Sequence, residues 1–446
     1  MTTMNEQQTR DFLLESFEKN RQHSRDLFAM IPDASYYERP IPLRHPFAFY
    51  EGHFPAFNIN TLAKKGHGVA GIDEAYEELF ERGIDPEDER EADGATISRW
   101  PTREQIASFG RRSDELIRTL LREAPLDRPD RPAMNRGEAA WNIFEHELMH
   151  HETLLYIFHA LDPAKKQMPE LAPVRPPAGR AIDHRARVFV PAGTATLGAD
   201  REAIRFGWDN EFDRHEVEVG AFEIDVYDVT NGEYLDFVEA GGYRNRELWT
   251  DEGWEWLDAA GVSAPHFWLK EGDGWKWRAM LGTVELPLDG PVWVTHAEAT
   301  AYARWKNRRL MTEAEYHRAA FGTPQGDERQ HPWGDEPAAP QHGNFGLQSW
   351  DPLPVGSFPA GRSAWGVEDL AGNGWEWTST EFAPFDGFRP MPSYDLYSID
   401  FFDGRHYVMK GASPATPSAL VRPTLRNWFR PTYPWVWASF RTVETV

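Results

Sequence analysis

The sequence predicts an α+β protein with a helical N-terminal half and a strand-rich C-terminal half. Up to about residue 162, apolar residues recur at three- and four-residue spacing, the periodicity of amphipathic helices. From Arg185 onward, short strand-like runs are broken by Gly, Pro and Asp. A chain of 446 residues exceeds what one hydrophobic core usually organises. We therefore expect two domains, 1–162 and 185–446, joined by a linker over 163–184 that gathers proline and charge without periodicity.

The individual elements follow from the local patterns. In the first half we expect roughly a four-helix bundle, drawn from periodic segments over 9–31, 45–65, 72–84, 102–124 and 136–161. In the second half we expect strands within 187–198 and 215–230 and a few helices, including 231–240 and 295–309. Most of the 19 tryptophans lie there, and aromatic core packing in a loop-rich fold explains them better than binding platforms.

The composition excludes several classes of function. The formal net charge of -24 repels polyanions, so we expect neither nucleic acid nor a membrane as a partner. Cysteine is absent, which excludes disulfides, thiolate metal sites and a cysteine nucleophile. The polar N-terminus and the lack of a long apolar run predict a cytoplasmic protein.

The segment HELMHHETLL, residues 146–155, concentrates candidate metal ligands on a predicted helix. At about 100° per residue, His146 and His150 lie about 40° apart and share the inward, apolar face. His151, Glu147 and Glu152 turn away from that pair, and Glu152 suits a supporting role such as orienting an imidazole. Two inward histidines one turn apart can bind one cation. Two separately satisfied core histidines are the alternative.

A third ligand should come from another helix of the bundle. Phe49, His53 and Phe57 form an i, i+4, i+8 stripe, which predicts that His53 faces the interior within an aromatic wall. His45 directly precedes Pro46 near the expected helix start, so a peripheral or capping role is favoured. Three neutral imidazoles fit zinc, copper or iron by donor type.

Two further groups of motifs carry a family resemblance. EDLAGNGWEWTST, VFVPAGTATLG, RLMTEAEYHRAAFG and the ending LRNWFRPTYPWVWASFRTV resemble the formylglycine-generating-enzyme type of C-type-lectin-like domain. Formylglycine-generating enzymes hold copper with cysteines, which this chain lacks. A DinB-like bundle with HxxxHxE, fused ahead of such a domain, resembles the ergothioneine- and ovothiol-type sulfoxide synthases, a family that includes selenoneine synthases.

The resemblance implies an activity and a metal. In that family a nonheme ferrous ion is held by three histidines, and the matching positions are His53, His146 and His150. Dioxygen drives the joining of sulfur from a thiol, or selenium from a selenosugar, to the imidazole C2 of hercynine. The implied partners are therefore hercynine, dioxygen, and a cysteine-type thiol or a selenosugar.

The resemblance also assigns substrate contacts. PSYDLYSIDFF matches the segment with an active-site tyrosine, so Tyr394 is the implied acid and Tyr397 a betaine contact; loop packing is the alternative for both. In LRNWF, Asn427 is the implied carboxylate contact and Trp428 the implied trimethylammonium contact, which gains cation-π attraction. Phe49 and Phe429 are expected to close the same pocket, with ordinary core packing as the alternative.

Two positions depart from the family pattern. Met149 stands where some ergothioneine enzymes have a glutamine that touches the imidazole. Phe429 stands where the actinobacterial branch has an aspartate used on γ-glutamylcysteine, so we expect cysteine or a selenosugar as the donor. Arg99 and Arg103 are candidates to pair with an anionic co-substrate, since guanidinium binds carboxylates bidentately; a solvated loop is the alternative.

Two other functions remain open from the sequence. The bundle metal could serve a DinB-type thiol transferase as a Lewis acid, without oxygen. The chain could also be a lectin-like ligand-binding protein on a structural metal bundle.

Overall fold

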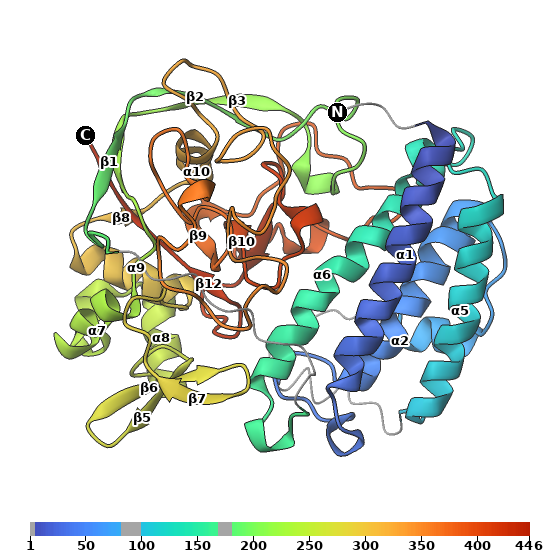
Figure 1. Ribbon diagram of the computed structural model, residues 1–446, viewed down its shortest axis with the longest axis horizontal. Helices are drawn as coiled ribbons and strands as arrows, with labels where there is room; N and C mark the ends of the chain where they lie inside the picture. Colours follow the sequence, from blue (N-terminus) through green and yellow to red (C-terminus); the bar gives the residue numbers. More distant parts are fainter. Residues whose placement is uncertain (1–4, 82–99, 168–180) are drawn as a thin grey trace. The chain divides into compact units, whose positions relative to one another are not determined.

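The computed structural model describes residues 5–81, 100–167 and 181–446, and it contains two compact units (Figure 1). The first unit comprises Met1–Glu170 together with Pro390–Tyr397, and the second comprises Leu171–Arg389 and Ser398–Val446. The first is helical and the second contains the sheets, so the predicted α+β class is confirmed.

Four long helices form the body of the first unit, and they lie side by side in Figure 1. They are α1 (Glu6–Ala29), α2 (Phe47–Asn58), α5 (Arg103–Glu123) and α6 (Glu138–Ala160). The predicted helix over 72–84 is reduced within the described residues to the single short helix α3 (Glu74–Leu79). Shorter pieces complete the unit: the π-helical η2 (Ile59–His67), which continues α2, and the 3₁₀ turns η1 (Asp33–Ser35), η3 (Pro132–Gly137) and η4 (Pro163–Lys165).

The helix starts are encoded locally. Asn5 with Gln8, and Thr102 with Gln105, form capping boxes that satisfy the first backbone N–H groups of α1 and α5. Helix α6 begins after Gly137, whose φ of 76° lies in the left-handed region that glycine tolerates. These signals place the start of α6 two turns before His146.

Helix α6 is buried on more faces than the single inward face that the sequence predicts. It contacts α1, α2 and η2. Glu147, His151 and Glu152, which turn away from His146, are therefore buried as well. Their polar atoms need partners inside the unit, because a buried polar group without one is unfavourable.

Within its described residues, the second unit contains four small sheets. Their strand orders are β1-β4-β13-β8, β11-β10-β9-β12, β2-β3 and β5-β6-β7, and all pairings are antiparallel except β12 with β9. The strands are β1 (Arg187–Val190), β2 (Gly193–Leu197), β3 (His215–Val219), β4 (Phe222–Asp225), β5 (Trp268–Glu271), β6 (Gly274–Ala279), β7 (Gly282–Glu285), β8 (Arg309–Leu310), β9 (Gly374–Glu381), β10 (Tyr407–Ala412), β11 (Asn427–Phe429), β12 (Ala438–Ser439) and β13 (Thr442–Thr445).

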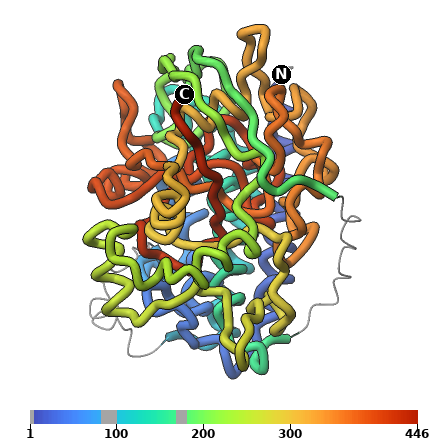
Figure 2. The backbone as a smooth tube through the Cα atoms, turned by 90° about the vertical axis from the view of Figure 1, so that its left-hand side faces the viewer, coloured from blue at the N-terminus to red at the C-terminus, as the bar shows by residue number. Residues whose placement is uncertain are grey.

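The C-terminal segment supplies an inner strand of the first of these sheets. Strand β13 lies between β4 and β8, with Val443 opposite Ile224, and the dark red C-terminal tube runs beside green segments in Figure 2. Helices accompany the sheets: α7 (Asn231–Glu239), α8 (Asp251–Ala260), α9 (His296–Trp305), α10 (Glu313–Ala320), and the 3₁₀ turns η5 (Asp209–Glu211), η6 (Gly242–Arg244), η7 (Arg246–Leu248), η8 (Pro359–Gly361), η9 (Ile399–Phe401) and η10 (Ser418–Leu420).

The GNGWEW run is a core element of the second unit. Trp377 is fully buried and donates from its indole Nε1 to the Val294 carbonyl at 2.9 Å. Glu376 pairs with buried Arg441 at 2.6 Å. The largest fully buried side chains include five tryptophans, which agrees with core packing as their role: Trp208, Trp277, Trp293, Trp377 and Trp437.

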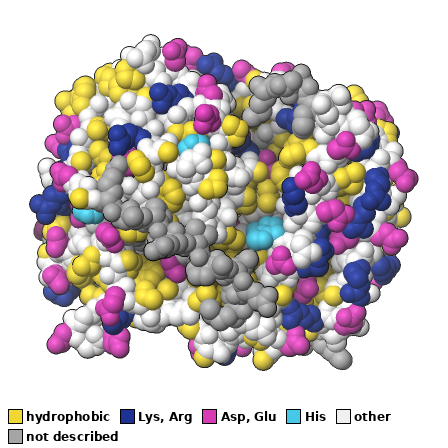
Figure 3. All heavy atoms as spheres, in the orientation of Figure 1, with side chains coloured by type: hydrophobic (Ala, Val, Ile, Leu, Met, Phe, Trp, Pro, Cys, Tyr) yellow, Lys and Arg dark blue, Asp and Glu magenta, His cyan; other side chains and the backbone are white. Residues whose placement is uncertain are grey.

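The face of the molecule in Figure 3 carries acidic and basic side chains interspersed with apolar ones. Among the helices of the described residues, none combines the length and apolar character needed to cross a membrane.

Candidate metal centre

Three histidines from two helices of the first unit converge. His53 lies on α2, His146 and His150 lie on α6, and one ring nitrogen from each lies within 4.8 Å of the others. The Nε2 atoms of His146 and His150 are 3.1 Å apart. Two nitrogens bound to one ion at about 2.1 Å and a right angle lie about 3.0 Å apart, so this spacing suits a shared cation. Among the described residues, no other group of His, Asp and Glu meets the same criterion.

The ring of His53 is oriented by a backbone carbonyl. Its Nδ1 lies 2.8 Å from the Phe80 carbonyl oxygen, which can only accept, so Nδ1 carries the proton. The lone pair therefore sits on Nε2. This is the outer hydrogen bond that metal-binding histidines use to fix their tautomer. Every residue has a backbone carbonyl, so the residue pattern could not show which one His53 would contact.

All three imidazoles are held neutral. Burial lowers the pKa of His53 to about 4, against the opposing effect of its backbone hydrogen bonds. Burial also lowers the pKa of His146 and His150 well below the ordinary value, and for these two the neighbouring imidazoles add to the effect. The Nδ1 atoms of His146 and His150 have no hydrogen-bond partner among the described residues. Their Nε2 atoms lie 3.1 Å apart, so one cation bound between the two rings would accept both lone pairs. The donor set fits a nitrogen-preferring transition metal.

The predicted aromatic stripe packs against two of the three imidazoles, those of His53 and His146. Phe57 stacks on His146 with ring centroids 3.5 Å apart and planes 7° apart, and Phe49 stacks on His53 at 5.1 Å. His45 stacks in turn on Phe49 at 4.1 Å and directly precedes Pro46, the N-cap residue of α2. Aromatic walls of this kind keep water from the imidazoles.

The structure brings Tyr394 to the histidines. Its segment, Pro390–Tyr397, belongs to the helical unit, although in the sequence it lies inside the part of the chain that forms the second unit. The Tyr394 ring lies 6.2 Å from that of His146 and 5.2 Å from that of Phe57, centroid to centroid. Tyr397 lies beside Tyr394 at 5.7 Å, and its hydroxyl is 3.6 Å from the Met149 sulfur.

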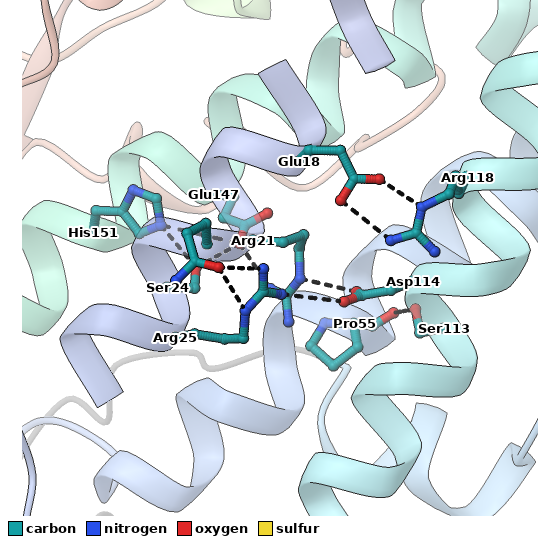
Figure 4. A network of polar contacts seen from close by, with 11 residues as sticks. Glu18, Arg21, Ser24, Arg25, Pro55, Ser113, Asp114, Arg118, Glu147 and His151 are labelled. Atoms are coloured by element: carbon teal, nitrogen blue, oxygen red, sulfur yellow. Dashed lines mark hydrogen bonds and ion pairs between the residues drawn. The ribbon is translucent and has the colours of Figure 1, made fainter. Parts of the chain in front are cut away.

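Two other polar residues of HELMHHETLL, Glu147 and His151, belong to a buried network on another side of α6, drawn in Figure 4. His151 Nε2 lies 2.8 Å from the Ser24 hydroxyl, which donates to Glu147 at 2.5 Å. Arg21 donates to the same Glu147 oxygen at 2.7 Å. Neither His151 nor Glu147 joins the histidine cluster.

Of the two arginines expected to bind an anionic co-substrate, only Arg103 lies within the described residues. Arg103 donates to the Phe28 and Ile31 carbonyls at 2.7 and 3.0 Å and pairs with Asp33 at 2.7 Å. The Arg103 guanidinium therefore binds residues of its own unit, and we propose no co-substrate contact for it. Arg99 lies outside the described residues.

The predicted hercynine contacts form strand β11 of the second unit, where all three are half-buried. Trp428 stacks on Phe382 with centroids 4.1 Å apart and planes 6° apart, and Phe429 packs on Tyr433 at 4.8 Å. The Asn427 side-chain oxygen accepts from the Trp428 amide at 2.9 Å. The aromatic pair of Trp428 and Phe382 offers a π face of the kind that binds quaternary ammonium groups. The sequence did not single out Phe382, which lies 46 residues earlier.

Each half of the chain matches a family of known proteins. A model of the DinB superfamily matches residues 16–154, and a model of the sulfatase-modifying factor enzyme 1-like domain matches residues 173–446. Both domain resemblances of the sequence are thereby confirmed.

Three relatives span most of the chain. A hercynine oxygenase of Mycobacterium tuberculosis is 39% identical over 67% of this chain and 69% of its own length. One from Mycolicibacterium thermoresistibile is 39% identical over 72% of each chain. Ergothioneine biosynthesis protein 1 of Neurospora crassa is 28% identical over 93% of this chain and 55% of its own length.

Proposed function

The chain belongs to the two-domain family that includes the hercynine oxygenases, and from this membership we propose that it couples a thiol to the imidazole C2 of hercynine with dioxygen as oxidant. The observation that carries the proposal is the cluster of His53, His146 and His150, three neutral imidazoles gathered in the helical unit. Three protein ligands leave coordination positions open on a metal ion, as catalytic metal sites do.

The proposed reaction balances with dioxygen alone. The C2–H bond of hercynine and the S–H bond of the thiol break, and a C2–S bond forms. Dioxygen takes up four electrons, two from bond formation and two from oxidation of sulfur. One oxygen atom ends on sulfur as a sulfoxide, and the other leaves as water with the two protons.

Iron is the metal we propose for the cluster. Imidazole nitrogens suit iron as well as zinc or copper, and only a redox-active metal serves an oxygen-dependent coupling. A ferrous ion would supply open positions and the electron-transfer chemistry that activates dioxygen. The chain's own residues orient the imidazoles through the Phe80 carbonyl and exclude water with Phe49 and Phe57.

We assign proton delivery to Tyr394. A phenol holds its proton at neutral pH and can donate it without carrying a charge itself. Its ring lies 6.2 Å from that of His146 and 5.2 Å from that of Phe57, centroid to centroid. The hydroxyl is the atom from which the proton would leave.

We assign the trimethylammonium group of hercynine to Trp428, on the strength of the matching LRNWF segment and the half-buried stack with Phe382. Trp428→Ala is expected to raise the KM for hercynine about 2- to 30-fold, because a good cation-π contact contributes about 0.5 to 2 kcal/mol. Steady-state kinetics at saturating thiol measure the change. Trp428→Phe, which keeps an aromatic face, should stay near the wild type; an unchanged KM in the alanine variant would contradict the assignment.

The donor follows from the neighbouring position. Phe429 packs on Tyr433. By the family resemblance it stands where the actinobacterial branch has an aspartate used on γ-glutamylcysteine. We therefore propose cysteine or a selenosugar as the donor.

Anaerobic reconstitution with ferrous iron, followed by air-saturated buffer and hercynine, tests the whole proposal. Cysteine, γ-glutamylcysteine and a selenosugar are supplied in parallel, with mass spectrometry of products and an oxygen electrode as readouts. We expect a hercynine adduct from cysteine or the selenosugar, with one dioxygen consumed per sulfoxide. Adduct formation without oxygen uptake would show that an oxidant other than dioxygen drives the coupling and would refute the oxygen dependence. No adduct with any donor would refute the proposed function.

A further inference from the structure

The segment Pro390–Tyr397 is held to helix α6 by a small set of buried and partly buried hydrogen bonds. Glu138, in the first turn of α6, accepts from the Ser393 backbone N–H at 2.9 Å and from the Ser393 hydroxyl at 2.8 Å. Asn142, one turn further along α6, donates from Nδ2 to the same hydroxyl at 3.0 Å. Ser393 thus makes three polar contacts with one helix.

These contacts have a fixed direction. An ionised carboxylate carries no hydrogen, so the Ser393 hydroxyl must donate to Glu138 and present its lone pairs to Asn142. The Asn142 amide must then donate, which turns its Oδ1 away from Ser393. That oxygen is buried and has no partner among the described residues. Leaving a buried amide oxygen unpaired is unfavourable, so simple packing does not account for the arrangement.

The same helix carries the histidines. Asn142, His146 and His150 are spaced by four residues, so they follow one another along one face of α6. Ser393 is bound at the start of this row, and the next residue in the chain is Tyr394, whose ring lies 6.2 Å from that of His146. One rigid helix therefore sets the positions of two candidate metal ligands and of the tyrosine.

We propose that Glu138, Asn142 and Ser393 are positioning residues that hold Tyr394 at the histidine cluster. Their effect on catalysis rests on the proposed function; the anchoring of the segment does not. The three residues act through Tyr394, and none of them is placed in contact with a substrate.

A second tether on the same segment supplies a matched control. Lys65 and Asp395 form an ion pair at 3.3 Å, and both side chains are exposed. Exposed ion pairs contribute little, because solvent screens them and the side chains lose freedom. Removing this pair changes the charge beside Tyr394 without touching the buried contacts.

Hydrogen exchange followed by mass spectrometry tests the anchor without any activity. Ser393→Ala and Glu138→Ala should each increase amide exchange in peptides covering 390–397 at least about 10-fold. Ser393→Thr, which keeps the hydroxyl, and Lys65→Ala should exchange like the wild type. Exchange that stays at the wild-type rate in both alanine variants would overturn the proposal.

A double-mutant cycle with Tyr394→Phe tests the positioning role. Ser393→Ala should lower kcat toward the value of Tyr394→Phe, at least about 10-fold, with iron content and the KM for hercynine unchanged. The double variant should be no slower than Tyr394→Phe alone, because a residue that acts only through Tyr394 has nothing left to position. Effects that multiply, or loss of iron in Ser393→Ala, would overturn the role. If the wild type forms no adduct, the proposed function fails while hydrogen exchange still decides the anchor.

Discussion

His146→Ala is expected to abolish iron binding and adduct formation together. The variant removes one of the three candidate ligand nitrogens. It also leaves a void beside the Phe57 ring, which stacks on the His146 imidazole at 3.5 Å in the wild type. Losing an outer partner of a metal ligand already costs about 10- to 100-fold in affinity, so losing the ligand itself should cost more. Iron content after anaerobic reconstitution and desalting measures the first effect, and mass spectrometry of the products measures the second.

His151→Gln is the matched control for this prediction. His151 is buried on the same helix, five residues after His146, but its Nε2 contacts Ser24 rather than the cluster. We expect this variant to bind one iron per chain and to unfold more easily than the wild type. Full iron content in His146→Ala, or equal loss of iron in both variants, would remove His146 from the set of ligands.

The candidate ligands could be predicted because their arrangement is local. The i, i+4 spacing of His146 and His150 is a property of one helix, and the stripe around His53 is a property of another. Both helices formed where the periodicity placed them. Their meeting was inferred from the lack of a third ligand on α6, and the structure brings the three nitrogens within 4.8 Å.

The contacts between Ser393 and α6 that hold Tyr394 could not be predicted from the sequence, for a physical reason. Glu138 and Ser393 are 255 residues apart, and no periodicity connects residues in different elements. Tyr394 itself was predicted as a site residue only because its segment resembles the family segment with the active-site tyrosine. The burial of Glu147 and His151 was also missed, because a helix that packs on several sides has no single inward face to predict.

Arg21→Met is expected to lower the free energy of unfolding by about 3 to 5 kcal/mol. Arg21 bridges three helices: it pairs with Glu147 of α6 at 2.7 Å and with Asp114 of α5 at 2.9 Å, as Figure 4 shows. Burial alone would lower the pKa of the guanidinium, but the two carboxylates raise it overall, so the group stays charged. Methionine fills similar space but leaves two buried carboxylates without their shared cation. Urea unfolding of the metal-free protein, followed by circular dichroism, measures the loss.

The control for this prediction lies a short distance away in the same view. Arg118 pairs with Glu18 at 2.5 Å across α5 and α1, but both side chains are partly exposed. Arg118→Met should cost at most about 1 kcal/mol, because water can solvate the carboxylate that is left behind. Both variants remove one guanidinium, but Arg21 is buried between two carboxylates from α5 and α6, whereas Arg118 has one partly exposed partner on α1. The difference between the two losses therefore measures what the buried network adds over a partly exposed pair. Equal losses in both would mean that the Arg21 network adds no more stability than a surface pair.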